Sequence, residues 1–118
     1  MIKLKRAYEK PAPEDGFRVL VERLWPRGLK KEALPLDLWL KDVAPSPELR
    51  RWFGHDPARC EEFRRRYWIE LAAQPAAVQL LREKLRQGQV TLVYGSRDQE
   101  HNAAVALKEF LENPASAG

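Results

Sequence analysis

Two arginines flank a tryptophan–proline pair near the start of the chain, directly after a short apolar run. The residues with chemical potential are Arg23, Trp25, Arg27 and Gly28. Guanidinium groups bind phosphate or carboxylate through paired hydrogen bonds, and an indole ring can stack on a base or a sugar. Glycine lets the backbone turn or approach a ligand closely. The spacing therefore predicts a site for an anionic ligand, with Trp39 as a second aromatic wall.

The same segment has a purely structural interpretation. In it, Arg23 and Arg27 form ion pairs with Glu22 or Asp42 and fasten a loop. Both interpretations remain open from the sequence, because two arginines beside a tryptophan indicate a site without indicating a reaction.

A second cluster follows an apolar, β-branched run near the end of the chain, and comprises Tyr94, Ser96, Asp98, His101 and Asn102. A strand, a Gly-Ser turn and then a helix would present free backbone N–H groups, which attract anions. We expect His101 in the first turn of that helix, where an imidazole could exchange protons near neutral pH. The alternative is that Ser96 or Asp98 only caps the helix.

Proton transfer, if the protein performs any, would fall to two carboxylates and one imidazole: Glu22, Asp98 and His101. His55, in an aromatic–Gly–His–Asp–Pro corner between two expected helices, is a further ligand-binding candidate. The corner is equally a good structural connector. Whether the protein is an enzyme is left undecided by these residues.

Several other chemistries find little support. Two histidines and Cys60 lack the spacing of a zinc site, so no metal and no cofactor is predicted. Gly-rich phosphate fingerprints and a nucleophile elbow are absent from the sequence. Cys60 falls on the apolar stripe of an expected helix, where we predict an inert core thiol.

Charge is unevenly distributed along the chain. Residues 1–31 hold nine Lys or Arg and four Asp or Glu, a net of +5 within a total of +4. This permits nucleic-acid binding, in which the basic segment contacts phosphates and tryptophans stack on bases. The alternatives are a small anionic ligand, or a solvated surface on a structural or partner-binding domain.

A single cysteine excludes an internal disulfide and fits the cytoplasm, and no apolar run is long enough to cross a membrane. The oligomeric state is not predicted.

The elements that must position these residues follow from periodicity and turn signals. Alternation predicts strands over residues 2–8, 17–23 and 89–94, with a possible third strand or short helix over 36–41. Helices are expected from Ser46–Pro47 to about Gly54, after Asp56–Pro57, over about 75–86 and over about 100–112. We expect residues 113–118 to fray.

In this order, the helical stretch between the middle and last strands is long enough to form a crossover connection. The order predicts an α/β fold: one small domain over residues 1–118, with a partly parallel sheet flanked by helices. Ligands of such sheets bind at the carboxyl ends of the strands, so the clusters would meet there.

Four segments together closely resemble the YeaO-like group of the family called domain of unknown function 488. They are residues 18–28 (Arg-Val-Leu-Val-Glu-Arg-Leu-Trp-Pro-Arg-Gly), 38–46, 52–57 and 90–102 (Val-Thr-Leu-Val-Tyr-Gly-Ser-Arg-Asp-Gln-Glu-His-Asn). The resemblance covers about residues 2–112. It implies a small bacterial or archaeal cytoplasmic α/β domain without an established activity.

By position, the family's signature falls on Arg23, Trp25, Pro26, Arg27, Gly28, Trp39, Trp52, His55, Asp56, Tyr67, Tyr94, Asp98, His101 and Asn102. Many relatives have Asp where this chain has Glu22. The wider family often ends its last strand with cysteine and opens the next helix with Cys-His-Arg, where this chain has Tyr94 and Glu100-His101-Asn102. Thiol chemistry of that kind is therefore not implied here.

Overall fold

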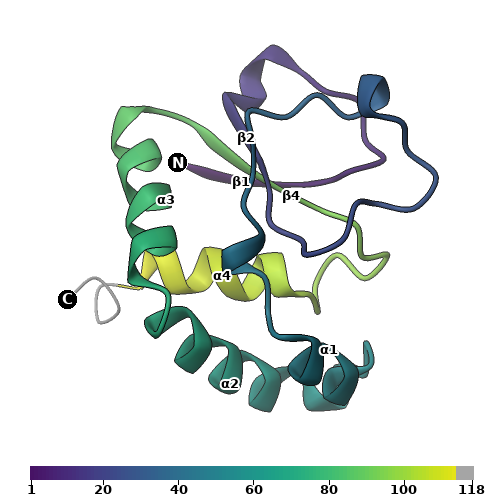
Figure 1. Ribbon diagram of the computed structural model, residues 1–118, viewed down its shortest axis with the longest axis vertical. Helices are drawn as coiled ribbons and strands as arrows, with labels where there is room; N and C mark the ends of the chain where they lie inside the picture. The colour runs from purple at the N-terminus through teal and green to yellow at the C-terminus, as the bar shows by residue number, and fades with distance from the viewer. Residues whose placement is uncertain (114–118) are drawn as a thin grey trace.

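Four parallel strands form the sheet of the computed structural model, which describes residues 1–113. In sequence they are β1 (Ile2–Arg6), β2 (Phe17–Leu20), β3 (Leu38–Trp39) and β4 (Val90–Tyr94), and in space their order is β1-β4-β2-β3 (Figure 1). All three pairings are parallel. The predicted α/β class is confirmed, and the sheet expected to be partly parallel is parallel in every described pairing.

The last strand in sequence lies at the centre of the sheet. Val90 is paired with Ile2 on one side and with Phe17 on the other, and all five residues of β4 are buried. The sequence of a strand that is covered on both faces is a continuous apolar, β-branched run. This is why β4 could be recognised from sequence.

The expected helices flank the sheet, and they all lie on one of its faces (Figure 1). The core under them includes Val19 and Leu92. Long loops cover the other face, where Leu20 and Val93 pack with Ala7 and Leu34 in a smaller apolar cluster. The four helices are α1 (Pro47–Phe53), α2 (Cys60–Ala72), α3 (Pro75–Gln87) and α4 (Ala103–Glu112).

Several expected boundaries are confirmed and others move. Ser46 caps α1 as predicted, with its hydroxyl accepting from the Leu49 N–H. Asp56 caps a short 3-10 turn, Pro57–Arg59, that leads into α2. Cys60 is therefore the first residue of α2 and half-buried, not a mid-helix core residue.

The first two strands end earlier than expected, at Arg6 and Leu20, because the chain leaves the sheet to cross its loop-covered face. The tentative strand over 36–41 shrinks to β3, and a 3-10 turn, Lys41–Val43, follows it. Helix α4 begins three residues later than expected, with Asn102 as its cap. His101 thus precedes the helix instead of lying in its first turn.

The predicted fraying concerns residues that, from 114 onward, lie outside the described part of the chain. Within residues 1–113, none of the helices has the length and apolar character needed to cross a membrane.

Candidate functional site

The carboxyl ends of the four strands meet at one edge, since all the strands run in the same direction. We call residues 6–8, 21–28, 39–41 and 94–97 the carboxyl edge. Side-chain hydrogen bonds join its parts: Glu22 Oε1 accepts from the Gly95 N–H at 3.0 Å, and Arg6 Nε donates to the Ser96 carbonyl at 2.8 Å. The segments that follow the strands leave this edge toward opposite faces of the sheet. In α/β folds this arrangement creates a crevice in which ligands bind.

Arg23 is held at this edge with one donor unused. Its Nη2 donates to the Ala44 carbonyl at 3.4 Å, while its Nε is buried and has no hydrogen-bond partner among the described residues. The predicted structural alternative, pairing of Arg23 or Arg27 with Glu22 or Asp42, does not form: within residues 1–113, neither arginine has a carboxylate within 4.0 Å. A buried N–H without an acceptor is costly, and such groups commonly mark a place for water or an ion.

Arg27 and Gly28 form the exposed turn of the edge. The Arg27 side chain is exposed, and its carbonyl accepts from the Tyr8 hydroxyl at 2.8 Å. Gly28 adopts φ of +81°, a left-handed conformation that favours glycine, and no atom lies within 4 Å of where a Cβ would stand. Gly28 is therefore explained by the turn, not by close approach of protein atoms.

Trp25 and Trp39 meet edge to face, with ring centroids 5.4 Å apart. Their indole N–H groups donate to the Leu29 carbonyl at 2.7 Å and the Glu22 carbonyl at 2.6 Å, which fixes both rings. The two rings wall an open hollow of about 430 Å³, with Lys31 at its rim. The predicted aromatic walls are thus brought together, although the hollow faces the loop-covered side.

Arg6 and Tyr8 belong to the edge but were not among the predicted residues. The Arg6 guanidinium lies 5.0 Å from the centre of the Tyr8 ring, and Tyr8 is 45% exposed. On the other side, the Lys41 ammonium lies 4.2 Å from the centre of the Trp39 ring. In both pairs one residue is the last of its strand and the other follows two residues later, a position that could have suggested them.

The second predicted cluster forms a self-contained turn after β4. Asp98 Oδ1 accepts from the backbone N–H groups of Glu100 and His101, both at 2.9 Å, and Oδ2 lies 3.0 Å from His101 Nδ1. The N–H of His101, then that of Glu100 and the His101 ring, lower the pKa of Asp98 against the opposing effect of burial. Ser96 Oγ accepts from the Asp98 N–H at 3.2 Å.

The N-terminus of α4 is capped from within the chain. The side-chain oxygen of Asn102, Oδ1, accepts from the Val105 N–H at 2.9 Å, and its side-chain Nδ2 donates to the Asp98 carbonyl at 2.7 Å. Since Asp98 binds the Glu100 and His101 N–H groups and Asn102 binds that of Val105, this geometry favours the capping interpretation of the cluster. Tyr94 is buried beneath it, which raises the pKa of its hydroxyl.

His101 and Asn102 also line a groove of about 350 Å³ between the start of α2 and α4. Cys60 lies in the wall of this groove, where burial raises the pKa of its thiol. A thiol held protonated is a poor nucleophile. Among residues 1–113, no three histidine, cysteine or acidic side chains are grouped so that they could hold a metal ion.

His55 stays apart from both clusters. It is exposed at the corner after α1, has φ of +56°, and its ring lies 6.2 Å from that of Phe53. The described contacts do not connect His55 with Arg23 or His101, so the three predicted clusters do not form one site.

The chain matches the family described as "Inactive DUF488-N3 subclade" over residues 1–117. It is 42% identical over 110 residues to the uncharacterized protein Rv3073c of Mycobacterium tuberculosis, covering 93% of this chain and 92% of that one. It is 38% identical over 112 residues to the uncharacterized protein YeaO of Escherichia coli, covering 95% and 97%. No solved structure gives a significant match. The chain therefore belongs to the DUF488 family, as a YeaO-like member of the subclade described as inactive.

Proposed function

We propose that the protein binds a phosphate-bearing ligand at the carboxyl edge and acts as a cytoplasmic binding domain without catalysis. The observation that carries this proposal is Arg23, whose Nε is buried and unpartnered at the ends of the strands. An anion oxygen would satisfy this donor with a charge-assisted hydrogen bond, which is stronger than one between neutral groups.

The charges around Arg23 support an anionic ligand. Five cationic side chains at the edge have no carboxylate within 4.0 Å among the described residues; they are Arg6, Arg23, Arg27, Lys41 and Arg97. Glu22 and Asp98 are engaged by backbone N–H groups instead. Unneutralised cations beside a crevice raise the local concentration of anions.

The absence of catalysis in the proposal rests on two observations. Asp98 and His101 form a hydrogen bond with each other that stabilises a turn, and Glu22 accepts from the Gly95 N–H. Each of the three candidates for proton transfer therefore makes a hydrogen bond that stabilises the local structure. The subclade to which the chain belongs is itself described as inactive.

A thermal-shift titration tests the proposal with inorganic phosphate, nucleoside monophosphates and acetate as probes. Losing a charged hydrogen bond is worth about 1.5–3 kcal/mol, so Arg23→Ala should bind at least about tenfold more weakly than the wild type. Arg65→Ala, on the outer surface of α2, is the matched control and should bind normally. Equal shifts for all three proteins, or no shift with any phosphate, would contradict the proposal.

Single-stranded nucleic acid is the second candidate ligand, favoured by Tyr8, Trp25 and Trp39 lying among the unpaired cations. Bases stack on such rings while the cations follow the backbone. Affinity for an oligonucleotide should then rise with its length and fall steeply between about 50 and 200 mM salt. Binding of a mononucleotide with equal affinity would favour the small ligand.

A further inference from the structure

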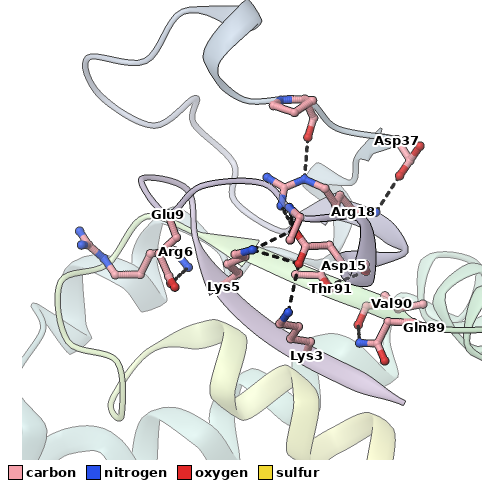
Figure 2. Close-up of polar contacts among 12 residues, drawn as sticks. Lys3, Lys5, Arg6, Glu9, Asp15, Arg18, Asp37, Gln89, Val90 and Thr91 are labelled. Carbon is pink, nitrogen blue, oxygen red and sulfur yellow. Dashed lines mark hydrogen bonds and ion pairs between the residues drawn. The ribbon is translucent and has the colours of Figure 1, made fainter.

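A second group of cations lies on the loop-covered face, in the half of the sheet away from the carboxyl edge. Asp15, in the 3-10 turn Pro13–Asp15 just before β2, is fully buried. Its carboxylate receives Lys3 Nζ at 3.2 Å, Lys5 Nζ at 3.0 Å and Arg18 Nη1. Figure 2 shows these three side chains converging on Asp15 from β1 and β2.

The Asp15 carboxylate has no acceptor capacity left. Oδ1 accepts from Lys3 and Lys5, and Oδ2 accepts from Lys5, from Arg18 and from the Ala12 N–H at 3.1 Å. A carboxylate offers about four lone-pair positions, and five hydrogen bonds from four donor groups already share them. Any further donor in this group needs another acceptor.

Arg18 has such a further donor. Its Nε donates to the Pro35 carbonyl at 2.8 Å and its Nη1 to Asp15, whereas its Nη2 is buried and has no hydrogen-bond partner among the described residues. Arg18 as a whole is 6% exposed, so solvent at the surface does not reach this nitrogen. Lys5, 8% exposed, has three ammonium protons and directs its hydrogen bonds to Asp15 alone.

The charges of the group do not cancel. Three cations face one carboxylate. A further acid, Asp37, accepts the backbone N–H of Arg18 at 2.8 Å without forming an ion pair with the Arg18 side chain. Excess charge away from water is costly unless a counter-charge lies beside it. An anion at Arg18 Nη2 would supply both the missing acceptor and the missing negative charge.

We propose that Arg18, Lys5 and Lys3 bind a small, halide-sized anion on the loop-covered face, at a site separate from the carboxyl edge. The small size follows from the burial of Arg18 Nη2, which a polyatomic oxyanion would reach only by displacing the covering loops. Lys3, whose side chain is 42% exposed, marks the side from which the ion enters.

Crystals of the wild-type protein soaked in bromide test this directly, because bromide scatters anomalously. We expect an anomalous peak at hydrogen-bond distance, about 3.3 Å, from Arg18 Nη2. Ordinary electron density there without an anomalous signal would identify a water and overturn the proposal. A bromide peak only at exposed lysines would overturn it as well, as an adventitious ion only.

A melting series in solution gives an independent test. Replacing gluconate with chloride at constant ionic strength should raise the melting temperature of the wild type in a saturable way, by the linkage between ligand binding and folding. Lys3→Gln, which leaves Lys5 and Arg18 on Asp15, should weaken the chloride effect, and Arg18→Lys, which removes Nη2, should abolish it. A chloride effect unchanged in both variants would refute the site.

Control variants separate this site from the carboxyl edge. Arg23→Ala and Arg65→Gln should keep the full chloride effect. If the effect disappears in Arg23→Ala but persists in Lys3→Gln and Arg18→Lys, chloride binds at the carboxyl edge and the proposed second site is wrong.

Discussion

The outer surface of the helices and the carboxyl edge use arginine in different ways. On α2, Arg66 lies 2.9 Å from Glu62 and Arg64 lies 3.4 Å from Glu109, so these arginines are neutralised by carboxylates one turn away or on α4. At the carboxyl edge, Arg23 and Arg27 have no such partner among the described residues. Both regions are rich in arginine, but only the carboxyl edge presents an uncompensated positive field.

This difference teaches that the number of cations in a segment is a poor guide to ligand binding. Paired surface charges contribute little to stability and little field at a distance. Unpaired cations held by hydrogen bonds at the strand ends can act together on one anion. Single substitutions can test this contrast between paired and unpaired cations, beginning with the buried cluster on the other half of the same sheet.

The largest effect is expected for Asp15→Ala. This change removes the carboxylate that binds Lys3, Lys5 and Arg18, and leaves buried cations without that counter-charge. Breaking a buried ion pair costs about 3–5 kcal/mol, so the free energy of unfolding in urea should fall by that amount. Glu14→Ala, an exposed neighbour in the same turn, should be nearly neutral. Equal stabilities of the two variants would contradict the role given to Asp15.

The pH dependence of the protein's stability tests the same role of Asp15. Burial works to raise the pKa of Asp15, but the Ala12 N–H, Lys5, Lys3 and Arg18 outweigh it and hold that pKa well below its usual value. A lowered folded-state pKa gives stability that is present above the unfolded value of about 4 and is lost as the pH falls below it. The stability difference between wild type and Asp15→Asn should therefore shrink from pH 5 to pH 2. A constant difference would show that the carboxylate charge is not responsible.

A smaller loss of stability is expected for Asn102→Ala at the start of α4. The side chain caps the helix and also binds the Asp98 carbonyl, and removal of such a cap typically costs about 1 kcal/mol. Thermal unfolding measures the loss, with the exposed Gln99→Ala as control. A melting temperature unchanged in Asn102→Ala would mean that another group caps α4, and would reopen its N-terminus as an anion site.

The smallest changes in stability are expected for substitutions of two exposed arginines, one on α2 and one at the carboxyl edge. Neither Arg65→Gln on α2 nor Arg27→Gln at the carboxyl edge should move the melting temperature by more than about 1 °C, because exposed charges contribute little to stability. Only Arg27→Gln should weaken phosphate binding. The contrast fails if both variants bind phosphate equally well.

Much of the fold could be predicted from local patterns. The β-branched run of β4 and the Ser46–Pro47 start of α1 carry strong signals, and both are confirmed. The strand expected as possible over 36–41 is present, although only two residues of it form β3. The loop-covered face could not be predicted, because its loops have no periodicity of their own. Three candidate caps within seven residues, Ser96, Asp98 and Asn102, left the start of α4 ambiguous until hydrogen bonds assigned Asn102.

The candidate site was predicted in part. Trp25 and Trp39 meet, and Arg23 lies at the same edge of the sheet, since parallel strands bring their carboxyl ends together. The Asp15 cluster was missed because Lys3 and Lys5 alternate with apolar residues on β1, and alternation alone indicates a solvated face. Only the path of the loop before β2 shows that this face is covered.

The most direct test of the central claim is an NMR titration that observes the arginine Nε–H resonances during addition of inorganic phosphate. Arg23, with its buried and unpartnered Nε, should show a large and saturable shift, while Arg65 on α2 should shift little. If Arg23 remains unchanged, or if all arginines drift together without saturation, the carboxyl edge is not an anion-binding site and the arginines there serve the fold alone.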